Sequence, residues 1–598
     1  MAQQVDLAVV GGGVAGLAAA LEAVQGQAGR PSPWRVALLE ASPQVGGKVL
    51  TVWEQGYLLE GGPDSFVTSK PGVLEMARRL GLEAELLPQG SSGSFIWSRG
   101  RLHPLPPGLL NLVPTRLLPV VTSRLFSWRG KLRMALDAVI PPRWGEADES
   151  LEAFVVRRLG REALERLAEP LVAGIHAGDP ATMSVRASFP RFVELEQAYG
   201  GLVRAAFVLR RQNRRRRRPR PEREPGPRRT FFMSFRGGLG QLVQAMADTL
   251  PPGTVRVGTR VERVDREADG YRLLLAGGDS LTARGVILAT PAAEAARLLR
   301  PLDPAAADLV ASVPQVSTAT ITLAFRRDAF PRPLQGSGFL VPAVEGRKIM
   351  GATYLSRKWP RPQPEEDVEL IRCFVGGVQQ PRLVEADDED LVAAAREELR
   401  AMLGVTAPPL FARVFRWPQG MHQYTVGHLE RMDRLEAALG RLPRLALAGA
   451  PYRGVGLPAC IESGLQAARQ VLAAADLWLD VATELPPSGG AQRAVSRAEW
   501  VELTLPVWRQ VADPIGVSVA EALATTMGTQ GPELPDGVDP AIAGLLGGVD
   551  MGAMVRRLGR LSFAMQVSQG AGTLAREVFG ATDTGLPLLT EPGTLLAM

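Results

Sequence analysis

The sequence predicts an α/β protein organised around a Rossmann-like domain, and its first forty residues carry the strongest evidence. An apolar run at Val5–Val10 is typical of a buried strand, and an alanine- and leucine-rich helical pattern follows it. A second apolar run, Val36–Leu39, ends at Glu40 and completes a β-α-β unit. Strand-like runs then alternate with helical patterns over residues 255–475, which extends the α/β prediction along the chain.

The turn between the first strand and its helix carries a dinucleotide-binding fingerprint. Gly11, Gly13 and Gly16 have the G-x-G-x-x-G spacing, which permits a tight turn, close approach of a pyrophosphate and close packing of helix on strand. The helix N-terminus offers unpaired N–H groups and a positive dipole end to the phosphates. Glu40 is placed to accept hydrogen bonds from ribose hydroxyls, and it argues against a ligand with a 2′-phosphate.

The composition is that of an ordinary globular protein with room for two or three domains in 598 residues. The two cysteines and four histidines match no metal-binding spacing, so we expect no metal. The apolar start lacks a basic n-region, and no run of about 18 apolar residues occurs. We therefore expect neither export nor a transmembrane helix, and a cytoplasmic location.

One arginine- and proline-rich segment, residues 212–230, dominates the charge of the chain. Eleven arginines and two glutamates between Arg210 and Arg229 give a local charge of +9, which leaves −3 for the remainder of a chain of net charge +6. The basic composition is therefore a property of one insert and does not indicate nucleic-acid binding. The segment lacks apolar residues, so we expect a disordered surface loop; the alternative is a patch for anionic lipid or an acidic partner.

Further motifs follow the fingerprint. Gly46-Gly47-Lys48 comes shortly after Glu40 and gives the backbone a second close approach to a ligand. Two hairpin-like strands then lead to a glycine-proline turn at Gly61–Ser65. The other distinctive stretches lie downstream: Ser150–Phe154, Arg157–Glu162, Ala177–Pro180, Ser188–Pro190, Ala448–Pro458 and Cys460–Gly464.

The early motifs resemble the FAD-containing amine oxidase superfamily. The downstream stretches resemble, more narrowly, the oxygen-dependent protoporphyrinogen/coproporphyrinogen III oxidase family, in its soluble Gram-positive-type branch. The resemblance covers about residues 5–475, apart from the arginine-rich insert. It implies FAD as the cofactor, with the backbone of Val261 at the adenine and a helix from about Ile461 to Ala475 starting near the flavin. The FAD-binding residues that it implies are Gly11, Gly12, Gly13, Val14, Ala15, Gly16, Glu40, Ala41, Gly47, Lys48, Gly62, Pro63, Asp64, Ser65, Val261, Ala450, Val455, Gly456 and Leu457.

The same resemblance implies a flat tetrapyrrole substrate. Ser94 stands where the eukaryotic branch has an arginine, so the propionate contact must come from elsewhere. His103 and His176 are alternatives as catalytic bases, although such histidines more often pack or hydrogen-bond, and no general base is evident. Ordinary core positions are the alternative for the three apolar residues in the set. The residues expected to contact substrate are Lys70 at a propionate, Gly178 at the pyrrole N–H groups through its carbonyl, and Leu334, Met350 and Phe374 around the ring.

The predicted domains alternate along the chain. A discontinuous FAD-binding domain is combined with a helical subdomain and a mixed α+β substrate-binding domain, and a C-terminal helical appendage without a recognisable function follows. The expected boundaries are 1–70, 231–295 and 440–480 for the FAD-binding domain, 71–211 for the helical subdomain, 212–230 for the arginine-rich loop, 296–439 for the substrate-binding domain, 481–492 for a linker and 493–598 for the appendage.

The resemblance implies a six-electron oxidation of a porphyrinogen to a porphyrin in heme biosynthesis, with molecular oxygen reduced to hydrogen peroxide. Coproporphyrinogen III is favoured and protoporphyrinogen IX is a close second, because the motifs do not separate two substrates that differ in two edge groups. The alternatives are an amine oxidase or carotenoid desaturase of the same superfamily, or a flavin-bearing scaffold without activity. The expected partners are the porphyrinogen substrate and molecular oxygen. A peripheral contact with a membrane or with a downstream heme-pathway enzyme is a further possibility, and the protein is expected to be a monomer or a homodimer.

Overall fold

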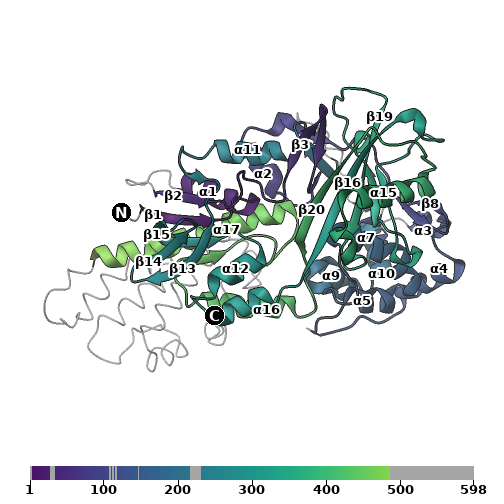
Figure 1. The fold of residues 1–598 in the computed structure, drawn as a ribbon. Helices are drawn as coiled ribbons and strands as arrows, with labels where there is room; N and C mark the ends of the chain where they lie inside the picture. The colour runs from purple at the N-terminus through teal and green to yellow at the C-terminus, as the bar shows by residue number, and fades with distance from the viewer. Residues whose placement is uncertain are drawn as a thin grey trace, which may run out of the picture. The chain divides into compact units, whose positions relative to one another are not determined.

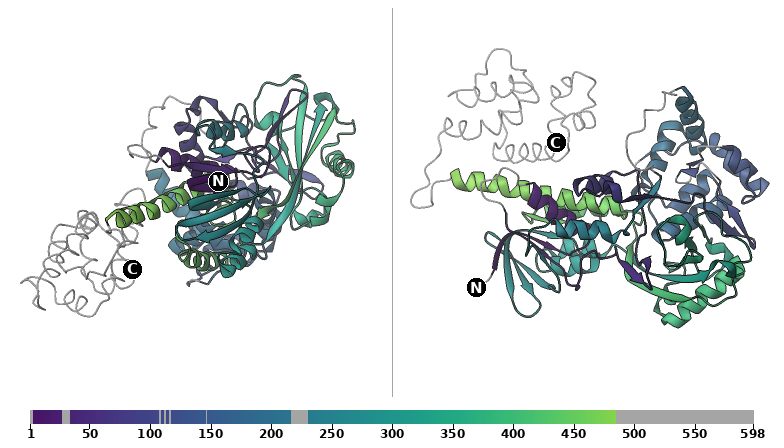
Figure 2. Two further views of the ribbon diagram at one scale, coloured as in Figure 1. Left: turned by 60° about the vertical axis from the view of Figure 1, so that its left-hand side comes forward. Right: turned by 90° about the horizontal axis from the view of Figure 1, so that it is seen from above.

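The computed structural model of the chain is shown in Figures 1 and 2. Its residues up to Leu472 belong to one compact unit. Two seven-stranded sheets lie beside each other in this unit, and a group of helices packs at the far side of the second sheet (Figure 1). The structure describes residues 3–26, 34–106, 109–110, 113–114, 117–145, 147–215 and 230–484.

The first sheet is built on β1 (Gln3–Val10), which pairs in parallel with β2 (Val36–Leu39) on one side and β15 (Ser280–Leu288) on the other. All four residues of β2 are buried, as expected for a parallel strand that is covered on both faces. The strand order is β12-β2-β1-β15-β14-β13, with β21 also paired to β15. The remaining strands are β12 (Val255–Arg256), β13 (Val261–Glu267), β14 (Gly270–Leu275) and β21 (Leu445–Leu447).

Two helices cross on the first sheet, next to the glycine turn. α1 (Val14–Gln25) follows β1, and the long α17 (Leu457–Glu484) lies against it. Gly464 is required at the crossing, because a Cβ there would lie 2.0 Å from the Ala15 carbonyl oxygen. The helix predicted for Ile461–Ala475 is therefore present but longer, and its last turn occupies the start of the predicted linker. Helices α11 (Gly240–Asp248), α12 (Ala292–Leu299), α13 (Pro304–Ala311) and α16 (His428–Leu439) complete this half.

The second sheet has the order β20-β16-β19-β18-β17-β7-β8. Its strands are mostly antiparallel, and α15 (Asp388–Leu403) packs Leu391, Ala395 and Leu399 against Ile321 and other apolar residues of the sheet. The bounds are β7 (Phe95–Ser98), β8 (Arg101–Pro104), β16 (Gln315–Arg326), β17 (Gly338–Leu340), β18 (Gly351–Tyr354), β19 (Val368–Gly376) and β20 (Phe411–His422).

The helical part carries its own apolar core, in which Phe154 and Phe192 stack with ring centroids 6.0 Å apart. Arg158 is fully buried there and pairs with Asp137 at 2.5 Å, which ties two helical segments together. The main helices are α3 (Leu117–Thr122), α4 (Trp128–Ala135), α5 (Leu151–Arg158), α6 (Arg161–Ala163), a π-helix (Leu164–Ala168), α7 (Glu169–His176), α8 (Val185–Ser188), α9 (Pro190–Tyr199) and α10 (Leu202–Arg215).

Small elements connect the two halves. A hairpin and a three-stranded sheet stand near the second loop of the predicted cofactor site. They comprise β3 (Thr51–Glu54), β4 (Tyr57–Glu60), β5 (Phe66–Val67), β6 (Leu86–Pro88) and β11 (Phe232–Phe235). The remaining short elements are α2 (Gly72–Arg79), α14 (Leu355–Lys358) and a separate two-stranded sheet of β9 (Leu109–Leu110) and β10 (Val113–Pro114).

The mixed α/β class predicted from the sequence is confirmed, with one correction at the arginine-rich insert. α10 continues to Arg215, so the first residues of the predicted 212–230 loop are helical. Residues 216–229, the linker beyond Glu484 and the predicted appendage at 493–598 lie outside the described residues. Among the helices that the structure describes, none is both long and apolar enough to cross a bilayer.

Candidate active site

The glycine turn after β1 has the geometry that an anion site needs. Gly11 has φ +106°, and a Cβ there would lie 2.6 Å from the Ala289 carbonyl oxygen. A Cβ on Gly16 would lie 1.9 Å from the Gly11 carbonyl oxygen, whereas one on Gly13 would meet nothing within 4 Å. The turn is therefore closely packed behind and open at Gly13. α1 starts at Val14 without a side-chain cap, so its first N–H groups face this open side.

Glu40 lies directly under the glycine turn. Its Oε2 accepts from the Gly12 N–H at 2.6 Å, and its Oε1 accepts from the Ser42 N–H at 2.7 Å. Each carboxylate oxygen keeps a free lone pair for a ribose hydroxyl. Ala41, the next residue, is exposed.

The connection between β12 and β13 passes the end of β2, where Glu40 lies. Thr259 donates its N–H to the Glu40 carbonyl at 2.7 Å, which places the start of β13 beside the predicted ribose position. Val261 is buried at the first position of β13. Its carbonyl oxygen accepts a hydrogen bond from Arg297 Nη2 at 2.8 Å. One lone pair of this oxygen is therefore occupied, and the other is open for the predicted contact with adenine.

Three predicted cofactor loops pack on one another. Gly46 donates to the Gly12 carbonyl at 2.8 Å, and a Cβ on Gly47 would lie 3.4 Å from Gly13 Cα. A Cβ on Gly62 would lie only 1.8 Å from the Lys48 carbonyl oxygen. The structure thus brings the fingerprint, the Gly46–Lys48 loop and the Gly61–Ser65 turn into one continuous backbone surface.

A buried charge cluster holds the Gly61–Ser65 turn, which also contains Pro63. Both carboxylate oxygens of Asp64 lie 3.0 Å from Lys358 Nζ, and Oδ2 accepts from Trp359 Nε1 at 3.2 Å. Arg372 Nη2 lies 3.5 Å from the same carboxylate, and Lys358 also lies 3.3 Å from Ser65 Oγ. The lysine, the tryptophan and the arginine all come from the second sheet and the helix beside it.

The backbone of the turn is held from the same direction. Arg372 Nη1 donates to the carbonyls of Glu60 and Gly62, both at 2.9 Å. The Gly61 carbonyl accepts from Trp417 Nε1 at 2.9 Å and from Thr320 Oγ1 at 3.1 Å. Side chains of β16, β19 and β20 therefore fix a loop that belongs to the cofactor half of the molecule.

Burial and charge act in opposite directions on these groups. Burial alone would raise the pKa of Asp64, but the charges of Lys358 and Arg372 outweigh it and hold the pKa of this carboxyl below its ordinary range. Burial lowers the pKa of Lys358, and the Asp64 charge opposes that shift. The cluster is thus a charged one. Glu60 differs, because burial raises its pKa to about 7 although Thr51 Oγ1 and the Leu239 N–H donate to it.

The loop before α17 is organised by Tyr424. The Tyr424 hydroxyl donates to the Ala450 carbonyl at 2.7 Å and accepts from the Gly454 N–H at 2.6 Å. His428 stacks on the tyrosine ring with centroids 3.9 Å apart. Ser184 donates its N–H to the Tyr424 carbonyl, so the same residue connects the loop to the stretch that follows the Ala177–Pro180 motif.

The end of this loop starts α17 beside the glycine turn. Gly449 donates to Ser463 Oγ at 3.0 Å, and Cys460 donates its N–H to the Gly456 carbonyl at 3.0 Å. The predicted residues Val455, Gly456 and Leu457 therefore lie at the N-terminus of α17, whose dipole favours negative charge.

Two lysines lie near the same helix end. Burial raises the pKa of the Cys460 thiol to about 11, and the charges of Lys48 and Lys70 oppose that rise. Burial also lowers the pKa of Lys48. His422, the last residue of β20, is buried, and burial together with the Lys48 charge lowers its pKa to about 3. Lys70 remains exposed, which suits a residue expected to bind an anionic edge group.

The structure brings three of the five predicted substrate residues together. Met350 forms an apolar cluster with Ala173 and Ala177, and Phe374 packs against it. Gly178 follows Ala177, and a Cβ there would lie 2.2 Å from Gln423 Oε1. The apolar cluster and the Gly178 backbone thus lie at one end of α7.

Leu334 lies apart from this cluster. It is buried in the apolar core beside the second sheet with Phe330, Val341 and Tyr354, and it is not part of the cluster around Met350. This burial favours the alternative stated from the sequence, an ordinary core residue, and the substrate contact of Leu334 stays a prediction.

Neither histidine singled out from the sequence has the environment of a base. His103 lies on β8, with Nε2 3.1 Å from the Ser98 carbonyl oxygen. Burial lowers the pKa of His176 to about 4, and its ring packs edge-on against Phe189. Glu169, at the start of α7, was not predicted; burial raises its pKa to about 7, and it accepts from the Ala343 N–H at 2.9 Å.

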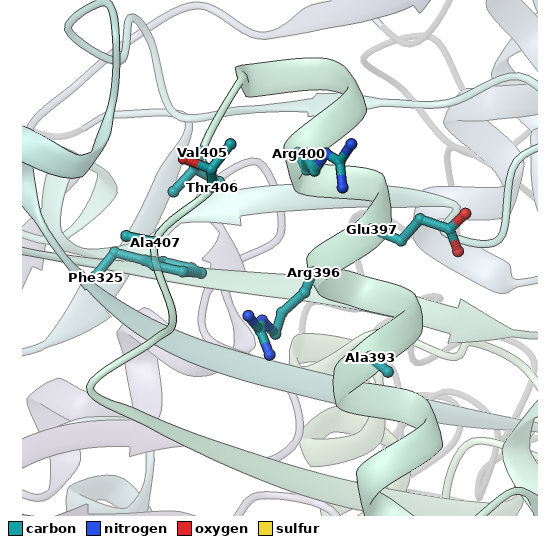
Figure 3. Close-up of a pocket in the computed structure, with 8 residues that line it drawn as sticks. All are labelled: Phe325, Ala393, Arg396, Glu397, Arg400, Val405, Thr406 and Ala407. Atoms are coloured by element: carbon teal, nitrogen blue, oxygen red, sulfur yellow. The ribbon is translucent and has the colours of Figure 1, made fainter.

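A separate cavity of about 250 Å³ is lined by residues of α15, of the segment that follows it and of β16 (Figure 3), and no predicted site residue is among them. It contains none of the residues of the cofactor loops or of the Met350 cluster. Its lining residues are Phe325, Ala393, Arg396, Glu397, Arg400, Val405, Thr406 and Ala407.

Comparison with known families agrees with this geometry. A family model for flavin containing amine oxidoreductases matches residues 14–472. The chain therefore belongs to the flavin-containing amine oxidoreductases, a class of enzyme that holds a flavin.

Its relatives narrow the assignment, and within that class the chain belongs to the porphyrinogen oxidase family. It is 33% identical to coproporphyrinogen III oxidase of Bacillus subtilis, over 78% of this chain and 97% of the relative. It is 36% identical to the enzyme of the same name from Propionibacterium freudenreichii, over 79% and 92%. The crystal structure of an Exiguobacterium protein, described as a candidate protoporphyrinogen oxidase, matches with a TM-score of 0.68 and 31% identity, over 80% and 99%.

A second family model, for zincin-like metallopeptidases, matches residues 455–598. The four histidines of the chain all precede this stretch, so it contains no H-E-x-x-H sequence and no imidazole for a zinc ion. Residues 485–598 of the match lie outside the described residues.

The role of Tyr424 gives a testable prediction. Tyr424→Phe removes the group that joins the Ala450 carbonyl to the Gly454 N–H, at a cost of about 1–3 kcal/mol. We expect the flavin dissociation constant to rise by roughly 5- to 100-fold, measured by titrating flavin into the deflavinated protein. Tyr271→Phe is the control, because its hydroxyl bonds the Pro443 carbonyl outside the cofactor loops. Equal flavin affinity in both variants would contradict this role.

Glu60 makes stability depend on pH. Its pKa is raised from 4.5 to about 7 in the folded protein, so between these values the folded state keeps a proton that the unfolded state has lost. Wild-type stability should fall as pH rises through this window, by up to about 1.4 kcal/mol per pH unit. Glu60→Gln should therefore gain relative stability from about pH 5 to 7 and level off above, measured by urea unfolding. Glu262→Gln, at an exposed site, should show no such trend; a parallel course for Glu60→Gln and wild type would refute the assignment.

Proposed function

We propose that this chain is an FAD-dependent, oxygen-using oxidase that converts a porphyrinogen to a porphyrin in heme biosynthesis, with coproporphyrinogen III preferred over protoporphyrinogen IX. The convergence of the glycine turn, Glu40, the Asp64 turn and the loop before α17 supports this proposal. Arg372, which holds the Asp64 turn, also lies 4.9 Å from the centroid of the Phe374 ring, which packs against the apolar cluster around Met350. The identity of 33–36% to bacterial coproporphyrinogen III oxidases supports the preferred substrate.

The residues present fit FAD. The open side of Gly13 and the uncapped start of α1 suit the pyrophosphate, and Glu40 suits the ribose. The Gly46–Lys48 loop, the Gly61–Ser65 turn and the start of α17 would hold the rest of the cofactor. When bound, the flavin supplies a hydride acceptor and is reoxidised by oxygen to give hydrogen peroxide.

The chain itself binds, orients and keeps the substrate dry in this proposal. Met350, Phe374 and Ala177 offer apolar contacts to the faces of the macrocycle. The Gly178 carbonyl accepts from pyrrole N–H groups, and Lys70 attracts a propionate. Loss of six hydrogens from the porphyrinogen balances the reduction of three oxygen molecules to three of hydrogen peroxide.

The preference between the two porphyrinogens is a matter of edge charge. Coproporphyrinogen III carries propionates at two positions where protoporphyrinogen IX carries vinyl groups. A cationic rim favours the former, and Lys70 is an exposed cation near the start of α17. We also propose the discontinuous FAD-binding domain and the separate substrate-binding domain with the boundaries expected from the sequence.

An aerobic assay tests the function. The purified chain should show flavin absorbance and should turn over coproporphyrinogen III faster than protoporphyrinogen IX, with porphyrin fluorescence above the autoxidation rate and peroxide released. Bound flavin without porphyrin formation would reject the oxidase proposal. Faster turnover of an amine would favour the amine oxidase alternative, and the reverse order of the two porphyrinogens would reject only the proposed preference.

Lys70→Ala tests the propionate contact. Loss of a charge-assisted hydrogen bond costs about 1.5–3 kcal/mol, so KM for coproporphyrinogen III should rise by roughly 10- to 100-fold at unchanged flavin content. Lys348→Ala is the matched control, since Lys348 pairs with Glu397 on the outside of α15. An unchanged KM in Lys70→Ala would remove this residue from the substrate site.

A further inference from the structure

The imidazole of His422 is a buried polar group that the proposed function leaves without a role. His422 is the last residue of β20, and only 3% of it is exposed. In the part of the chain that the structure describes, no group hydrogen-bonds its ring, and Nδ1 is a buried atom without a partner. A buried polar group left unpaired costs free energy, so this ring indicates a partner that the protein itself does not supply.

A neighbouring buried histidine shows what an ordinary structural role looks like. His428 stacks on the ring of Tyr424, and its Nε2 lies 2.6 Å from the Tyr452 carbonyl oxygen. One of its two nitrogens is therefore used within the protein. His422 has no equivalent contact, although it is at least as well buried as many of the apolar residues around it.

The chain neighbours of His422 show which side its ring faces. β20 is an edge strand of the second sheet, on the side of the first sheet (Figure 1). Met421 packs against the apolar cluster around Met350, and Gln423 Nε2 donates to the last carbonyl of α7 at 2.8 Å. Successive side chains of an extended chain point to opposite sides, so His422 faces away from α7. Tyr424, the next residue on that side, holds the loop before α17.

Lys48 acts on the same place from the cofactor loop that contains it. Burial, followed by the charge of Lys48 and by His428, lowers the pKa of His422 to about 3. The Lys48 charge also opposes the rise in the pKa of Cys460, so its ammonium lies within electrostatic reach of both the end of β20 and the start of α17. The imidazole is therefore uncharged at neutral pH, and it can donate one hydrogen bond and accept another.

We propose that His422 hydrogen-bonds the polar edge of the flavin ring and is a cofactor-binding residue of this chain. The inference rests on the proposed function. The pyrimidine part of a flavin carries carbonyl oxygens, ring nitrogens and an N–H group, which an imidazole and an ammonium group can satisfy. The pyrophosphate and the ribose have their own candidates in the glycine turn and Glu40, so the ring edge is the part of FAD that the unpaired imidazole suits.

Titration of the deflavinated full chain with FAD and, separately, with ADP tests the proposal. His422→Phe keeps a ring but removes both nitrogens, so the FAD dissociation constant should rise by roughly 5- to 100-fold. ADP has the pyrophosphate and the adenosine but no flavin, so its affinity should not change. His422→Asn places an amide near the position of Nδ1 and should keep most of the wild-type affinity for FAD. The visible absorption bands of bound flavin should shift in His422→Phe and return in His422→Asn.

His103→Phe is the matched control, because His103 is half-buried on β8 outside the cofactor loops; it should bind FAD and ADP like wild type. Melting temperatures verify that each variant is folded. Equal losses of FAD and ADP affinity in His422→Phe would show a merely structural role and overturn the proposal. Unchanged FAD affinity would overturn it as well. A wild-type protein that binds FAD without forming porphyrin would reject the oxidase function but not this contact, whereas failure to bind FAD would contradict both.

Discussion

The buried carboxylate of Asp64 is the interaction on which the arrangement of the site depends. It sits in a backbone turn of the half that contains the first sheet, and its partners Lys358, Trp359 and Arg372 all come from the second sheet and the helix beside it. A charge buried to this extent cannot be left without partners, because breaking such a pair costs about 3–5 kcal/mol. The two halves are therefore fixed relative to each other at a turn that the sequence predicts to contact the cofactor.

The hydrogen bonds around this cluster extend the same constraint to the backbone. Arg372 and Trp417 donate hydrogen bonds to backbone carbonyls of the Gly61–Ser65 turn. This turn packs on the Lys48 carbonyl, and the Gly46–Lys48 loop packs on the glycine fingerprint. Tyr424 closes the opposite side by linking the loop before α17 to the end of β20. The cofactor loops, which are glycine-rich and have little side-chain packing of their own, thus take their rigidity from the second sheet.

The sequence predicted the features that are encoded locally. The fingerprint, Glu40 and the strands around them follow from short-range periodicity and glycine spacing, and α1 and β2 are present at the expected places. The ion-pair partners of Asp64 could not be predicted from the sequence. Lys358 is 294 positions away, and a single lysine without a local motif does not indicate its partner. The sequence left two interpretations of Leu334 open, because an apolar residue has the same pattern in a core and in a pocket, and the structure places it in a core cluster. α10 extends into the insert because arginine is a good helix former, although its composition suggested a loop.

Cations in this chain have two different fates, and burial decides between them. Lys358, Arg372 and Arg158 are buried, and carboxylates or carbonyls surround them. Their charges therefore stabilise contacts inside the fold. Arg129 on α4 is exposed instead, next to the exposed side chain of Trp128. Exposed charge of this kind contributes little to stability, but it remains free to act on something outside the molecule. The fold therefore holds its two halves together with internal charge, and the exposed Arg129 of α4 takes no part in that contact.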